Sequence, residues 1–93
     1  MHFVISCRDK PDHQDVRMEN RPAHVDYLKS HSGKIVAAGP TLGEAPEQMT
    51  GSVLIMEFGS LAEVEEWAAN DPYAKAGLFE SVTITPWKKV FPN

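Results

Sequence analysis

A histidine and an aspartate, His24 and Asp71, are the residues whose types and surroundings most suggest chemistry in this sequence. His24 follows Pro22, and a proline suits the first turn of a helix because its missing N–H would be unpaired there. We therefore expect a helix to begin at Arg21-Pro22, with the imidazole near the positive end of the helix dipole. Asp71 precedes Pro72, and the residue before a proline is disfavoured in helical geometry. Asp71 should thus lie in the turn just after another helix.

If the two side chains meet, they form a His-carboxylate dyad. A carboxylate on one imidazole nitrogen fixes the tautomer and raises the basicity of the other nitrogen, as a general base near neutral pH requires. Nothing local in the sequence joins the two residues, and each has a simpler interpretation. A lone helical histidine is often a partly buried or surface residue, and an aspartate before proline is often only a turn former.

Four further residues are candidates for substrate binding. Arg21, one helical turn before the histidine, could clamp a carboxylate or phenolate bidentately, although a surface salt bridge is an equal alternative. Either Tyr73 or Arg21 could stabilise the negative charge that develops on a substrate during proton transfer. Ser52 and Ser6 are hydroxyls on predicted strands, and we favour ordinary strand hydroxyls over nucleophiles because no Gly-x-Ser-x-Gly motif occurs. Gly39-Pro40 interrupts a predicted strand where the backbone could approach a ligand closely.

Charge and composition argue against several classes of partner. The 93 residues carry a formal net charge of -4 and no basic stripe, which disfavours nucleic acid and anionic membrane surfaces. Nowhere do eighteen apolar residues run together, and no basic leader precedes the first apolar stretch, so we expect a cytoplasmic protein. The single cysteine, Cys7, cannot form an internal disulfide and is expected to be a small buried hydrophobe.

The sequence also argues against a bound metal or nucleotide. His24 and His31 would lie about two helical turns apart, roughly 10 Å, too far for the i, i+4 spacing of helical zinc motifs. Neither a Gly-x-Gly-x-x-Gly nor a Walker motif occurs. We therefore expect no metal site and no cofactor.

The hydrophobic pattern predicts one α+β domain over residues 1–93. Strands are expected at 3–7, 34–38, 52–58 and 79–90, and the main helices at 22–33 and 60–71. Gly33 should stop the first helix, and Ser60 with Glu63 forms a capping box for the second, whose inner side carries Leu61, Val64 and Trp67. The order βαββαβ is the ferredoxin-like plan, an antiparallel four-stranded sheet with both main helices on one face.

Three finer features complete this prediction. The strand at 52–58 is apolar on both sides and should be central and covered twice. Segment 41–51 has no periodicity, so it is expected to be either a lid or a solvated hairpin connection. Residues 73–77 can form a short helical turn.

Five short motifs accompany this plan: Arg-Pro-Ala-His at 21–24, Ala-Gly-Pro at 38–40, Thr-Gly-Ser at 50–52, Asp-Pro-Tyr at 71–73 and Pro-Trp-Lys-Lys-Val-Phe at 86–91. With them the chain resembles, nearly end to end, the YciI-like proteins, small members of the dimeric α/β-barrel group that is also similar to muconolactone isomerases. The resemblance implies a ferredoxin-like sheet dimerised face to face, with His24 and Asp71 paired in a pocket between helices and sheet. One branch of this family acts as a dehydrochlorinase on a chlorinated hydroxyhydroquinone with that pair, and other members have no settled substrate.

Two functional hypotheses follow. In the first, the protein is a small cofactor-independent lyase or isomerase in which His24, held by Asp71, moves a proton on a small anionic or phenolic ring compound. In the second, it is a non-catalytic ligand-binding or accessory module, and the same pair is a structural hydrogen bond. The first requires an accessible His24, whereas a structural pair would be closed to solvent.

The predicted strands are apolar on both faces, which points to a homodimer. Val4 faces away from Phe3 and Ile5, and Val53 and Ile55 face away from Leu54 and Met56. Two helices can cover only one face of such a sheet, so the other would expose a large apolar patch. A second copy of the chain is the expected cover.

Overall fold

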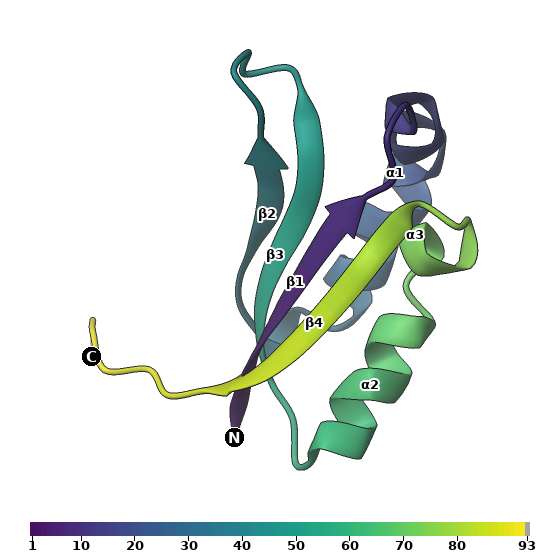
Figure 1. Ribbon diagram of the computed structural model, residues 1–93. Coiled ribbons are helices and arrows are strands. Elements are labelled where there is room, and N and C mark those ends of the chain that lie inside the picture. Colours follow the sequence, from purple (N-terminus) through teal and green to yellow (C-terminus); the bar gives the residue numbers. More distant parts are fainter. Residues whose placement is uncertain (93) are drawn as a thin grey trace.

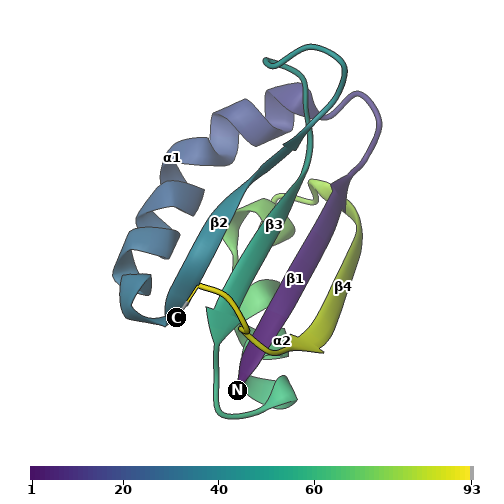
Figure 2. The ribbon, with the colours of Figure 1, turned by 90° about the vertical axis from the view of Figure 1, so that its left-hand side faces the viewer.

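Four antiparallel strands form one sheet in the order β2-β3-β1-β4, and all the helices lie on the same face of it (Figures 1 and 2). This computed structural model describes residues 1–92. The elements are β1 (His2–Asp9), α1 (Gln14–Ser30), the 3-10 turn η1 (Ser32–Lys34), β2 (Ile35–Leu42), β3 (Met49–Glu57), α2 (Leu61–Ala69), α3 (Pro72–Lys75) and β4 (Phe79–Trp87). The predicted ferredoxin-like plan is confirmed, with α3 as the short helical turn expected after the second helix. Within residues 1–92, no helix is both long and apolar enough to span a membrane.

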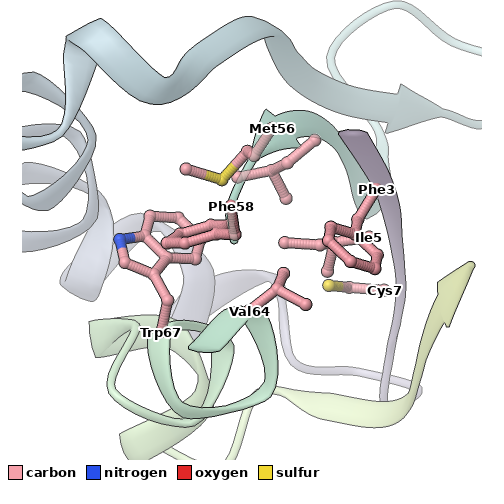
Figure 3. Packing of buried hydrophobic residues seen from close by; sticks show 8 residues of the cluster. Phe3, Ile5, Cys7, Met56, Phe58, Val64 and Trp67 are labelled. Atoms are coloured by element: carbon pink, nitrogen blue, oxygen red, sulfur yellow. The ribbon is translucent and has the colours of Figure 1, made fainter. Parts of the chain in front are cut away.

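The core lies between the two central strands and α2. Phe3 and Ile5 of β1 stand opposite Met56 and Leu54 of β3, and none of these four side chains is more than 1% exposed. Figure 3 shows this cluster packing toward the side chains that α2 contributes. Burial of each large apolar side chain contributes roughly 1.5–3 kcal/mol, so this layer fixes the register of β1 against β3.

An aromatic contact holds α1 against α2. The Tyr27 ring stacks on Trp67 with 4.8 Å between ring centroids, and its hydroxyl donates to the Trp67 carbonyl at 2.8 Å. At the start of α2, Ser60 Oγ accepts from the backbone N–H of Glu63 at 3.3 Å, as a cap at this position should. Leu61, expected on the inner side of this helix, is 46% exposed because the first turn of α2 extends past the ends of the strands (Figure 1).

The first helix begins earlier than the sequence analysis predicts. Since α1 starts at Gln14, Pro22 lies inside the helix and His24 is far from the positive end of the dipole, so that expectation is wrong. Pro22 is exposed, and the carbonyl that loses its helical N–H donor therefore lies on the hydrated side of α1. The helix also ends at Ser30, before Gly33, which lies in η1.

The hairpin between β2 and β3 is longer and its loop shorter than predicted. β2 continues through Gly39-Pro40 to Leu42, and β3 already begins at Met49, so only residues 43–48 connect the two strands. Pro40 fits within β2 because this is an edge strand with one unpaired side. The predicted break at Gly39-Pro40 is thus wrong. Segment 41–51 contains a hairpin connection, one of the two expected alternatives, but its irregular part is limited to residues 43–48. The last strand likewise ends at Trp87 rather than at residue 90.

Gly51 offers a test of this register. A Cβ at Gly51 would overlap the carbonyl oxygen of Cys7, which stands on the neighbouring strand, whereas a Cβ at Gly33 would meet no atom within 4 Å. We expect Gly51→Ala to force β1 and β3 apart and to lower the free energy of unfolding by about 1–3 kcal/mol or more. Gly33→Ala, the matched control, should leave it unchanged or raise it slightly. Denaturant melts check this, and equal stability of the two variants would contradict it.

Cys7 is a buried residue of β1, as predicted, and this makes its thiol unreactive. Burial raises the pKa of Cys7 to about 12, Asp71 and Asp9 add to the rise, and Arg17 opposes it. At pH 8 the folded protein therefore carries almost no thiolate, the form that reacts. We expect iodoacetamide to label native protein at least about 1,000-fold more slowly than denatured protein, since labelling must await unfolding. Rapid labelling of the native protein would contradict this burial.

Candidate active site

A small cavity of about 160 Å³ opens between α1, the β2–β3 hairpin and α3. One face of α1 supplies Arg17, Arg21, His24 and Leu28, whose spacing repeats with the helical period. The predicted binding residues Arg21, Pro40, Ser52 and Tyr73 all line the cavity with His24. The structure therefore gathers side chains from four separate elements around one hollow.

His24 and Asp71 are in contact, as the resemblance implies. Nδ1 of His24 lies 2.8 Å from Oδ1 of Asp71, and the two residues are 8% and 3% exposed. An ionised carboxylate can only accept a hydrogen bond, so Nδ1 carries the proton and the lone pair of the neutral ring is on Nε2. Nε2 has no hydrogen-bond partner among residues 1–92 and is not fully buried. The accessible nitrogen thus belongs to a residue that lines the cavity.

The Asp-Pro-Tyr segment places this carboxylate. Asp71 is the N-cap of α3, and its Oδ1 also accepts the backbone N–H of Tyr73 at 2.9 Å. Pro72 occupies the first helical position, where its missing N–H leaves nothing unpaired. The Tyr73 ring then stacks on the imidazole of His24, with 3.9 Å between centroids and 15° between planes. Three consecutive residues therefore cap a helix, bind the imidazole and cover its face.

A buried charged residue, Arg17, also contacts the Tyr73 ring. Its Nε and Nη2 donate to the two carboxylate oxygens of Asp9 at 2.7 and 2.9 Å, and Nη2 also donates to Ser52 Oγ at 2.8 Å. The guanidinium carbon lies 4.6 Å from the centroid of the Tyr73 ring. Burial acts to lower the pKa of Arg17, but hydrogen bonding and attraction to Asp9 outweigh it and the pKa is raised. Arg17 stays charged although only 2% of it is exposed.

Burial of the Tyr73 phenol is the main influence on its pKa. Burial raises the pKa of the Tyr73 phenol, the nearby Asp71 carboxylate adds to the rise, and the positive charges of Arg17 and Arg21 partly offset it. The net shift is upward, so the phenol remains protonated at neutral pH. It can therefore act as a hydrogen-bond donor to a bound molecule.

Sequence reasoning missed Arg17 because it placed the start of the helix at Pro22. Extending the helical period backward from His24 through Arg21 reaches Arg17 on the same face, and this signal was available in the sequence. Burial of an arginine among hydrophobic strands also calls for a carboxylate partner, which Asp9 supplies from the end of β1.

Two other kinds of site, a metal centre and a larger cleft, have less support as the active site. In the part of the chain that the structure describes, no three His, Cys, Asp or Glu side chains gather as metal ligands would. A larger cleft of about 750 Å³ lies between the β1–α1 connection and the tip of the β2–β3 hairpin, but neither His24 nor Asp71 lines it. The smaller cavity is therefore the candidate active site.

Comparison with a solved structure supports the same arrangement of elements. The 5-chloro-2-hydroxyhydroquinone dehydrochlorinase TftG from Burkholderia phenoliruptrix AC1100, solved in complex with 2,5-dihydroxybenzoquinone, superposes with a TM-score of 0.91. Its sequence is 43% identical to this chain, and the match covers 95% of this chain and 94% of TftG. This chain is thus similar over nearly its whole length to a protein described as a dehydrochlorinase.

Sequence comparisons identify the family. Protein YciI of Escherichia coli O6:H1 is 39% identical over an alignment of 98 positions that covers 98% of this chain and 100% of YciI. The derivative of benzaldehyde biosynthesis cluster protein C of Emericella nidulans is 39% identical over 83 positions, covering 81% of this chain and 85% of that protein. The YCII-related domain family matches residues 1–88. The chain therefore belongs to the YciI-like, YCII-related family.

Proposed function

We propose that this protein is a small lyase or isomerase in which the His24–Asp71 pair moves a proton on a small phenolic or carboxylate ring compound. The observation that carries the proposal is the 2.8 Å contact between Nδ1 and the Asp71 carboxylate, which directs the basic nitrogen of a cavity-lining histidine away from its partner. The likeness to the dehydrochlorinase TftG favours elimination of hydrogen chloride as the reaction class.

The proton has a defined route in this proposal. Nε2 of His24 accepts a proton from the bound ring compound, while Nδ1–H stays hydrogen-bonded to Asp71. Asp71 remains ionised and stabilises the imidazolium that forms, as a buried carboxylate does in other His-Asp pairs. In a dehydrochlorination the substrate loses this proton and a chloride ion, so no external oxidant or reductant is needed.

The size and polarity of the cavity support a single ring as substrate. A cavity of about 160 Å³ is close to the roughly 150 Å³ that holds benzene in an engineered protein core. Val25, Leu28 and Leu54 give it apolar walls. Arg21 makes no ion pair with another described residue, and the phenol of Tyr73 can donate. Both groups can meet the negative charge that develops on a ring oxygen as the proton leaves.

The non-catalytic alternative uses the same contacts differently. A ligand-binding module would also hold the pair at 2.8 Å, with Asp71 serving only as the cap of α3. It would bind a ring compound and leave it unchanged. Measurement of turnover beside binding therefore separates the two functions.

We expect His24→Asn and Asp71→Asn to lower kcat by about 10²–10⁴-fold, because each removes the general base or its tautomer control. The trial substrate is 5-chloro-2-hydroxyhydroquinone, and chloride release is the measurement. Asp26→Asn, an exposed carboxylate on α1, is the matched control and should keep full activity. Chloride release by His24→Asn at the rate of the unaltered protein would refute the catalytic role. Binding of the compound without any turnover by the unaltered protein would favour the module.

We also propose that the protein is a homodimer formed through the open face of the sheet. No helix of residues 1–92 covers this face, which Figure 2 shows toward the viewer. Val4, Val53 and Ile55 share it by register and are only half-buried. The segment after β4 leads away from the sheet in Figure 1, with Val90 and Phe91 75% and 85% exposed. A second copy would cover both features, in an interface of roughly 2,000 Å² or more.

Sedimentation equilibrium at micromolar concentration tests the dimer. We expect a mass near twice 10.3 kDa for the unaltered chain. Ile55→Lys should give a monomer, because it places a charge at the centre of the proposed interface. Leu61→Lys alters an exposed leucine on α2, on the helical side, and should remain dimeric. A mass near 10.3 kDa for the unaltered chain would contradict the proposal.

A further inference from the structure

We infer that Met49 is a specificity-determining residue, whose side chain separates the small cavity of His24 from the larger cleft and so restricts the bound compound to a single ring. This inference rests on the proposed function, because it names the size class of substrate that the same site accepts. The small cavity measures about 160 Å³ and the cleft about 750 Å³. A compound with two fused rings therefore needs more space than the small cavity offers.

Met49 is the point at which the two spaces meet. The small cavity is lined by residues of α1, β2, β3 and α3, and the cleft by the β1–α1 connection, the hairpin tip and the neighbouring strand ends. Of residues 1–92, only Met49 lines both spaces. Its side chain is apolar and half-buried, and a methionine has enough rotatable bonds to fill an irregular gap. Met49 therefore forms the wall between the cavity and the cleft.

A β-bulge turns Met49 toward the small cavity. On β3, Val53 and Ile55 face the open side of the sheet, and strict alternation would place Met49 on that side as well. The pairing with β2 passes from Gly51 directly to Met49, so Thr50 is an extra residue in β3. The extra residue reverses the alternation, and Met49 joins the side chains that line the small cavity. Bulges often lie beside active sites, where they re-aim a side chain in this way.

Gln14, the first residue of α1, holds this wall in place. Its Oε1 accepts the backbone N–H of Met49 at 3.2 Å, and its Nε2 donates to the carbonyl of Glu47 at 3.1 Å. These bonds tie the hairpin tip to the start of α1, which lies beside it in Figure 2. The next residue, Thr50, shares a hydrogen bond with the hydroxyl of Thr41 at 2.9 Å. Hydrogen bonds thus fix the backbone around Met49 and leave its side chain to contact a ligand.

The wall should discriminate by size without excluding larger compounds completely. In an apolar pocket, one methylene too many changes the discrimination between two compounds by about 10- to 200-fold. A methionine side chain can also change its rotamer to make room, which moderates the preference. We therefore expect the unaltered protein to bind a one-ring hydroxyquinone about 10- to 100-fold more tightly than a two-ring one.

The test compares two acidic hydroxyquinones by calorimetric titration. The one-ring probe is 2,5-dihydroxybenzoquinone, and the two-ring probe is 2-hydroxy-1,4-naphthoquinone. Met49→Ala removes the wall and should tighten binding of the two-ring probe by about 10-fold or more, because its second ring then reaches the cleft. Binding of the one-ring probe should weaken by less than about 10-fold, since only one apolar contact is lost. Met18→Ala, which truncates an exposed methionine of α1 outside both spaces, should change neither affinity.

Two further variants keep the test decisive if Met49→Ala disturbs the hairpin. Met49→Val shortens the side chain but suits a strand, so it should shift the ratio of the two affinities in the same direction. Gln14→Ala keeps the methionine but removes both bonds that hold the hairpin tip, and it should also favour the two-ring probe. Asp15→Ala, at an exposed neighbour outside both spaces, is its control and should leave the ratio unchanged.

The ratio of the two affinities decides the outcome. Equal affinity of the unaltered protein for both probes would overturn the role of Met49, as would an unchanged ratio in Met49→Ala and Met49→Val or the absence of binding in every variant. A shifted ratio together with undiminished turnover by His24→Asn would overturn the proposed catalysis and leave the role of Met49 standing. Turnover that depends on His24, with an unchanged ratio, would do the reverse.

Discussion

The carboxylate of Asp71 is the group on which the rest of the site depends. One oxygen, Oδ1, accepts hydrogen bonds from both the imidazole of His24 and the backbone of Tyr73. The first bond sets the tautomer of the base, and the second begins α3 and so places the ring that covers the base. Because the carboxylate is only 3% exposed, both bonds form where water competes little. Loss of this one group would disturb the orientation of the histidine and the start of α3 together.

Arg17 and Asp9 form a second buried polar unit next to the first. A buried ion pair gains little stability over apolar packing, because desolvation of the two charges offsets most of their attraction. Stability alone therefore does not account for an arginine that is 2% exposed between α1 and the sheet. Its contacts do something that an apolar residue could not, since they fix Ser52 on β3 and present a cation to the Tyr73 ring. The fold thus maintains a buried charged group among the residues that line the cavity, beside apolar side chains such as Leu28 and Leu54.

Local sequence patterns predict a helix or strand correctly where only one local structure fits the pattern. The apolar run at 52–58, the cap at Ser60 and the exit of Asp71 before Pro72 all depend on contacts within a few residues. Two prolines, Pro22 and Pro40, lie inside elements that the local pattern predicts to begin or end at them, because each is tolerated for a tertiary reason. Pro22 lies on the exposed side of α1, and Pro40 lies in an edge strand. A proline is compatible with a continuing helix or strand where the carbonyl that loses its N–H donor faces water or the strand lies at an edge.

The pairing of His24 with Asp71 could not be derived from the sequence alone, because it depends on how α1 packs against the segment after α2. Stacking of Tyr27 on Trp67 brings these helices together one turn further along α1. That contact is aromatic and apolar, and nothing in it indicates chemistry. The resemblance to the family supplied the pair, whereas the buried role of Arg17 required the packed structure. The core contacts that hold the helices are thus also what brings the base, its carboxylate and the arginine around one cavity.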